Sequence, residues 1–229
     1  MSELSSLLTI VIPIALVASI SPTTFAVMIV LLSLSKKPKT SGLGFLVGSL
    51  IIILLAALLG IFVAESASLI DYADISILPA WMNVILGVIL FSFGVKTSFK
   101  KEYNADEETE NLKDKYQSYG FWGSVLLAMG IFTLNLITTI LVFFASSQIG
   151  LSNVNLIGKT ISLIILISIT LLLVEIPLLI CFLVPQKADN ILSKLNGWIQ
   201  KNGHYLTAGL TIIIGIYLIS KGLGELNLI

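Results

Sequence analysis

Six long apolar runs divide this chain, and they constrain its fold more than any other feature. They cover about residues 4–34, 41–64, 79–98, 120–148, 156–184 and 205–222. A helix needs ~20 apolar residues to span a bilayer. Only 11% of the residues are charged and the mean hydropathy is +1.02, whereas soluble domains hold roughly 25% charged residues. The sequence therefore predicts an all-α, multi-pass protein of the cell membrane with six transmembrane helices.

The lysines predict how the chain lies in the membrane. The sequence has thirteen lysines and no arginine, and all but Lys159 and Lys221 lie at or in the connections between runs 1 and 2, 3 and 4, and 5 and 6. Cytoplasmic loops carry the excess of positive residues. We therefore expect these three connections inside the cell and both termini outside it, an N-out/C-out arrangement.

The two halves of the chain resemble each other. Thr23-Thr24 in the first run matches Thr138-Thr139 in the fourth, and the pattern G-x4-S-x-G occurs at 87–94 in the third run and at 215–222 in the sixth. Because each half has an odd number of spans, the second half would enter the membrane from the opposite side. This predicts two inverted three-helix repeats, an arrangement common in transporters. The predicted units are repeats 1–98 and 119–229, joined by a charged cytoplasmic linker 99–118.

A segment before the last run differs from the other connections. Within 188–204, apolar residues recur at helical spacing while lysines occupy other positions. This pattern is typical of a helix lying in the membrane interface. We therefore expect a short amphipathic helix at about 188–203.

Polar residues interrupt the first run in its middle, in the stretch SISPTTF. Proline lacks an N–H and breaks or kinks a helix, and Ser21 followed by Pro22 is a good helix start. A second half-helix beginning there would present a positive N-terminus, which favours anions. Asn135 stands at the matching level of the fourth run, where it could cap a second half-helix or bond to another helix. The alternative is a simple kink in which the hydroxyls bond to their own helix. The predicted substrate-binding residues are Ser21, Pro22, Thr23, Thr24, Asn135, Thr138 and Thr139.

Glu175 is the only acidic residue well inside an apolar run. A carboxyl at mid-membrane costs on the order of 2–3 kcal/mol on insertion scales, and such residues are functional candidates. A role in proton coupling is one hypothesis. The other is a neutral acid that bonds to a neighbouring helix, where Pro177 frees a carbonyl.

Several function classes find no support in the composition. The chain has one cysteine, Cys181, and one histidine, His204. They form no cluster with metal-ligand spacing, so we expect no metal or other cofactor. Without a nucleophile–base pair or paired carboxylates inside the runs, we expect no enzyme activity. The absence of a basic patch argues against nucleic acid as a partner.

Two long segments resemble a known family. They are PIALVASISPTTFAVMIVLLSLSKKPKTSGLGFLVGSL and EIPLLICFLVPQKADNILSKLNGWIQKNGHYLTAGLTIIIGIYLISKGL. Both are similar to the GAP family, the Sap-type sulfolipid-addressing proteins within the lysine exporter (LysE) superfamily. The resemblance implies a six-span, exporter-like fold and the export of a lipid-linked or small solute. The fourth span of that superfamily often carries Asn-Pro, whereas Leu136 follows Asn135 here.

Together these features favour a secondary transporter. We expect an exporter or flippase for a small or lipid-linked amphipathic or anionic substrate, with proton coupling through Glu175 as one hypothesis. Membrane lipids are the expected partners, and a homo-oligomer is an open alternative to a monomer. The other functional hypothesis is a non-transporting scaffold or accessory subunit of an envelope or lipid pathway.

Overall fold

The computed structural model describes residues 2–68, 77–99 and 119–226, and every regular element in these ranges is helical. The first half holds α1 (Ser2–Ser19), α2 (Pro22–Leu34), α3 (Pro38–Ser68) and α4 (Ile77–Ser98). The second half holds α7 (Phe121–Leu134), α8 (Leu136–Leu151), α9 (Leu156–Thr170), α10 (Leu172–Leu183), the 3₁₀ turn η1 (Pro185–Lys187) and α11 (Ala188–Glu225). The predicted all-α class is confirmed for these residues. The predicted linker 99–118 lies outside them, apart from its first residue.

The helices support a membrane protein with several crossings. Pro38–Ser66 in α3 and Lys201–Gly224 in α11 are each long and apolar enough to span a bilayer. Three more spans arise if the bent pairs α1–α2, α7–α8 and α9–α10 each count as one, and α4 adds the shorter apolar stretch Asn83–Ser98. The described residues thus hold two to five candidate spans. A sixth crossing, through α4, and the N-out/C-out orientation stay predictions.

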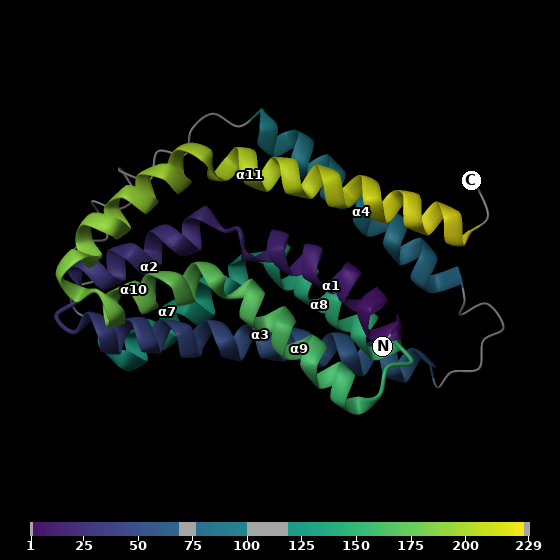
Figure 1. The fold of residues 1–229 in the computed structure, drawn as a ribbon, viewed down its shortest axis with the longest axis horizontal. Helices are drawn as coiled ribbons and strands as arrows, with labels where there is room; N and C mark the ends of the chain where they lie inside the picture. The colour runs from purple at the N-terminus through teal and green to yellow at the C-terminus, as the bar shows by residue number, and fades with distance from the viewer. Residues whose placement is uncertain (1, 69–76, 100–118, 227–229) are drawn as a thin grey trace.

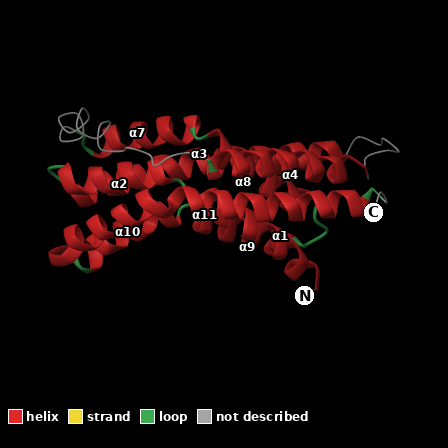
Figure 2. Ribbon diagram, turned by 90° about the horizontal axis from the view of Figure 1, so that it is seen from above, coloured by secondary structure: helices red, strands yellow, loops and turns green. Residues whose placement is uncertain are grey.

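The helices form a bundle and a separate pair beside it. Helices α1, α2, α3, α7, α8, α9 and α10 pack into the bundle, while α4 and α11 run together along one side of it (Figures 1 and 2). α4 packs mainly on α11, which also contacts α2. We call the α4–α11 pair the arm. α1 begins and α11 ends at the same end of the molecule, and α2 turns into α3 at the other end (Figure 1).

Glycines let the two helices of the arm approach closely. A β-carbon at Gly87 would lie 2.8 Å from the carbonyl oxygen of Gly215 and 2.8 Å from the amide nitrogen of Ile219. A β-carbon at Gly215 would lie 2.8 Å from the carbonyl oxygen of Gly87 and 2.7 Å from the amide nitrogen of Phe91. Helices in lipid associate through such close packing of small residues, since lipid tails supply no hydrophobic driving force.

The contacts of the arm also match one another position by position. Gly94 faces the carbonyl oxygen of Ala208, at 3.0 Å from its would-be β-carbon, and Gly222 faces that of Ala80 at 2.6 Å. Gly94 and Gly222 are 128 positions apart in the chain, and so are Ala80 and Ala208. Gly87 and Gly215 are separated by the same 128 positions, so each contact of α4 with α11 has an equivalent contact of α11 with α4. The two helices therefore run antiparallel about a local two-fold axis. An inverted repeat requires this relation between its third helices.

The amphipathic segment is not a separate helix. We predicted a helix at about 188–203 followed by a span from 205, but α11 continues without interruption from Ala188 to Glu225. Glycine weakens a helix interior by only about 1 kcal/mol relative to alanine, so Gly203 does not end it. A β-carbon at Gly203 would lie 3.0 Å from the Cγ of Pro22, so this glycine marks the point where the arm crosses the start of α2.

Candidate functional site

The first apolar run is broken where the sequence predicted. α1 ends at Ser19, α2 begins at Pro22, and their axes differ by 57°. Ser21 is the N-cap, with its Oγ accepting a hydrogen bond from the Thr24 amide at 3.3 Å and lying 2.8 Å from the Thr24 hydroxyl. Pro22 occupies the first helical position, where no N–H is needed. A capped helix start therefore lies inside the apolar run.

The fourth run is broken at Asn135, although no proline stands there. α7 and α8 meet at 78°, and Asn135 caps α8 through its Oδ1, which accepts from the Thr138 amide at 3.5 Å. The Thr139 hydroxyl lies within donating distance of the carbonyl oxygens of Phe132, at 3.0 Å, and Asn135, at 3.3 Å, and the Asn135 carbonyl also accepts the Thr139 amide. An asparagine cap is thus sufficient to start a helix here.

The two breaks contact each other directly. The side-chain amide of Asn135 donates from Nδ2 to the Ser21 hydroxyl at 3.1 Å, and the Thr138 hydroxyl donates to the carbonyl oxygen of Ala18 at 3.0 Å. These residues lie 114 and 120 positions apart in the chain. The hydrogen bonds join the end of α1 and the start of α2 to the start of α8.

A cavity of about 580 Å³ lies at this junction, between the bundle and the arm. Its volume is within the range of ligand pockets, roughly 300–1,000 Å³. Its lining residues come from the two breaks, from α1 and α2, from the end of α4 and from the middle of α11. They are Val17, Ile20, Ser21, Pro22, Thr23, Phe93, Lys96, Thr97, Phe99, Asn135, Ile137, Thr138, His204, Thr207 and Thr211.

The structure brings most of the predicted site residues to this cavity. Ser21, Pro22, Thr23, Asn135 and Thr138 line it. The other two predicted residues, Thr24 and Thr139, are not among the lining residues. Of these, Thr24 is buried and pairs with Ser21. A substrate-binding role for any of these residues remains a prediction.

Glu175 lies away from the cavity. It stands in the first turn of α10, directly after a third break in which α9 and α10 meet at 70°. Its side chain is partly buried, and it is not among the residues that line the cavity. A role in proton coupling would therefore act through movement of α10, which packs on α2 and α3.

Sequence reasoning missed the part of the site that the arm contributes. Lys96 and Thr97 from the end of α4, and His204 from α11, face the same cavity as Ser21 and Asn135. In the sequence, Lys96 is only one of the lysines of the predicted cytoplasmic connections, and His204 is a single histidine outside any motif. No local signal in the sequence shows that the arm lies across the breaks.

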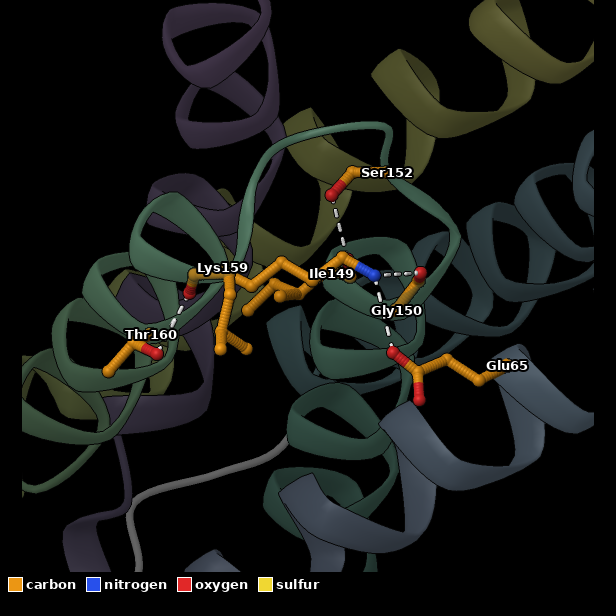
Figure 3. A network of polar contacts seen from close by, with 7 residues as sticks. Glu65, Ile149, Gly150, Ser152, Lys159 and Thr160 are labelled. Atoms are coloured by element: carbon orange, nitrogen blue, oxygen red, sulfur yellow. Dashed lines mark hydrogen bonds and ion pairs between the residues drawn. The ribbon is translucent and has the colours of Figure 1, made fainter.

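A second polar cluster ties the opposite end of the bundle together (Figure 3). Lys159, at the start of α9, donates to Glu65 Oε1 of α3 at 3.2 Å and to the carbonyl oxygen of Gly150 in the last turn of α8 at 2.8 Å. The Lys159 amine thus links the three helices α3, α8 and α9. In the described part of the chain no group of three or more His, Cys, Asp or Glu side chains is placed to hold a metal ion.

Comparison with known proteins decides the family. A family model described as SfLAP, "Sap, sulfolipid-1-addressing protein", matches residues 11–224. The chain belongs to the SfLAP family. The match covers both breaks, the cavity and the arm, so these features belong to the SfLAP region of the chain. No curated protein and no solved structure matched the chain.

Proposed function

We propose that this protein is a secondary transporter of the cell membrane, an exporter or flippase that moves an amphipathic or anionic substrate through the cavity between bundle and arm. The observation that carries the proposal is the meeting of two capped, interrupted helices at a mainly apolar cavity whose wall also carries polar side chains. Secondary transporters place their sites where discontinuous helices meet. The description of the SfLAP family, which names sulfolipid-1 addressing, favours a lipid-linked substrate.

The proposal includes a six-span architecture with two inverted repeats, related to the lysine exporter superfamily, with both termini outside the cell. The position-matched contacts of α4 and α11 support the inversion, because repeats with the same orientation would make these two helices parallel. Proton coupling through Glu175 completes the proposal. A partly buried acid beside the bend between α9 and α10 is a physically reasonable carrier for a proton.

The test is lipid movement in reconstituted vesicles. Proteoliposomes are loaded with NBD-labelled phosphatidylglycerol, and quenching by external dithionite reports movement between leaflets. We expect the protein to accelerate movement over empty vesicles, and Asn135→Ala to abolish most of that acceleration, since it removes one of the two hydrogen bonds that join the breaks.

Asn155→Ala is the matched control. Asn155 caps α9 as Asn135 caps α8, with its side chain accepting from the Gly158 amide at 2.9 Å, but it does not line the cavity. Each variant loses one helix cap, worth about 1 kcal/mol, and only Asn135→Ala also loses a hydrogen bond between the two breaks. Equal transport by the two variants would contradict the proposal. If the protein moves no lipid, and Pro22→Ala and Thr23→Val leave its cellular role intact, the scaffold hypothesis is favoured.

A further inference from the structure

The hydroxyl groups at the two breaks are largely occupied by protein partners. The Ser21 oxygen receives hydrogen bonds from the Asn135 side chain and the Thr24 amide, and the Thr138 hydroxyl donates to the Ala18 carbonyl. These groups hold the interrupted helices in place. Recognition of a ligand must therefore depend strongly on the other polar groups that face the cavity.

The arm supplies most of those groups, and two of them are basic. Lys96 stands in the last turn of α4 and His204 stands on α11, and both line the cavity. None of the described lining residues is acidic. Within the described ranges the ion pair found is Lys159 with Glu65, at the other end of the bundle, so no described carboxylate pairs with Lys96.

The bundle reinforces this positive character from the opposite wall. α2 and α8 both begin at the cavity, and a helix N-terminus carries roughly half a positive charge. Thr23, in the first turn of α2, has an exposed side chain that faces the cavity. An anion held between the arm and these helix starts would meet two basic side chains on one side and two positive helix ends on the other.

We infer that Lys96 and His204 form an oxyanion subsite on the arm, which binds the sulfate- or phosphate-type group of the transported substrate. This inference rests on the proposed function and names the residues that select the substrate. Lysine donates up to three hydrogen bonds and histidine at least one, and hydrogen bonds between charged groups and oxyanions are the stronger kind.

The size of the cavity indicates which part of an amphiphile it would hold. A volume of about 580 Å³ accommodates roughly twenty non-hydrogen atoms at ~30 Å³ each, the volume of a water molecule in the liquid. That is enough for a head group but not for a lipid with two long chains. Phe99 lines the cavity and is 83% exposed, so the cavity opens to the outside of the bundle at an apolar edge. Lipid chains would leave the cavity there.

The experiment measures binding to the purified full-length protein in detergent. The probes are an NBD-labelled sulfated galactosylceramide, the same lipid without its sulfate, and inorganic sulfate as a competitor. We expect the sulfated lipid to bind at least tenfold more tightly than the neutral one. We expect Lys96→Gln and His204→Gln each to weaken it about tenfold, the effect of losing one charge-assisted hydrogen bond, and Lys96→Arg to bind nearly as the wild type does.

Lys194→Gln is the control for general attraction between lysines and anionic lipids. Lys194 is exposed on the same helix as His204 but does not line the cavity. Competition by millimolar inorganic sulfate that depends on Lys96 would support the subsite and identify a free anion as its ligand, whereas no competition would identify the lipid head group. Equal binding of the two lipids, or equal losses in Lys96→Gln and Lys194→Gln, would overturn the inference.

The binding experiment and the transport experiment can each fail without the other. Binding is measured without transport, so a protein that binds the sulfated lipid through Lys96 but moves none would retain the subsite and refute the transporter. A protein that moves both lipids equally, and does so unchanged in the double variant Lys96→Gln/His204→Gln, would retain the transporter and refute the subsite. Thermal unfolding of each variant identifies any that fails to fold.

Discussion

At the scale of single residues, Glu175 offers the sharpest test of energy coupling. Its position directly after the bend between α9 and α10 would let a proton alter the packing of α10 without contact between the acid and the substrate. We predict that Glu175→Gln abolishes the dependence of lipid movement on an imposed proton gradient and leaves equilibrium binding within about threefold, because the cavity does not contain this residue. Lipid movement is measured with and without the gradient.

Glu65→Gln is the control, since Glu65 is an acid outside the bend with a side chain 54% exposed. A gradient response that persists in Glu175→Gln but disappears in Glu65→Gln would contradict a coupling role for Glu175 and assign that role to Glu65. Residue-level reasoning succeeded where the signal is local, as for the cap Ser21. It missed Lys96 and His204, because their place at the cavity depends on how distant helices pack.

At the scale of helices, the chain shows which local signals decide a break. The Ser-Pro pair predicted the break before α2, whereas Asn135 left a cap and a bond across helices as alternatives. In the structure each of these residues provides an acceptor for the first free amides of its helix. The break before α10 was not predicted, because Leu171 makes no side-chain cap. Conversely, Gly203 was expected at a helix end but lies within α11. Because it has no side chain, α11 can pack closely on Pro22 at this point.

The cluster around Lys159 yields a prediction about how three helices are held together. Its amine bonds both to the exposed carboxylate of Glu65 and to the carbonyl of Gly150 in the last turn of α8, where a positive charge also complements the helix dipole. We predict that Lys159→Met lowers stability by about 1–2 kcal/mol, and that Glu65→Gln lowers it by less than about 1 kcal/mol, as for other exposed ion pairs. Thermal unfolding in detergent at low and high salt measures both.

Salt separates the two contributions in that experiment. High ionic strength screens the exposed pair with Glu65 but has less effect on the shorter bond to the Gly150 carbonyl. The difference between Lys159→Met and wild type should therefore persist at 1 M salt. Equal effects of the two substitutions would mean that the carbonyl bond contributes nothing, and that the ion pair alone holds α9 to α3.

At the scale of the whole molecule, the arm is joined to the bundle mainly by α11, because α4 packs chiefly on α11. The all-α class was predictable from the apolar runs, and the shared G-x4-S-x-G pattern predicted a relation between α4 and α11 that stays a prediction. The placement of the arm across the two breaks was not, since it depends on contacts between helices far apart in the chain. The geometry of the arm then sets the width of the cavity, which lies between arm and bundle.

The local two-fold axis of the arm makes a quantitative prediction. Gly87 and Gly215 face each other's carbonyl oxygens at the same would-be distance of 2.8 Å, so Gly87→Ala and Gly215→Ala should destabilise the protein equally, by about 1–3 kcal/mol for overpacking. Gly209→Ala on α11 is the control: nothing lies within 4 Å of its would-be β-carbon, and alanine should stabilise that helix by up to about 1 kcal/mol. Thermal unfolding measures all three. Unequal losses at Gly87 and Gly215 would show that the axis does not govern packing, and would remove the main structural support for inverted repeats.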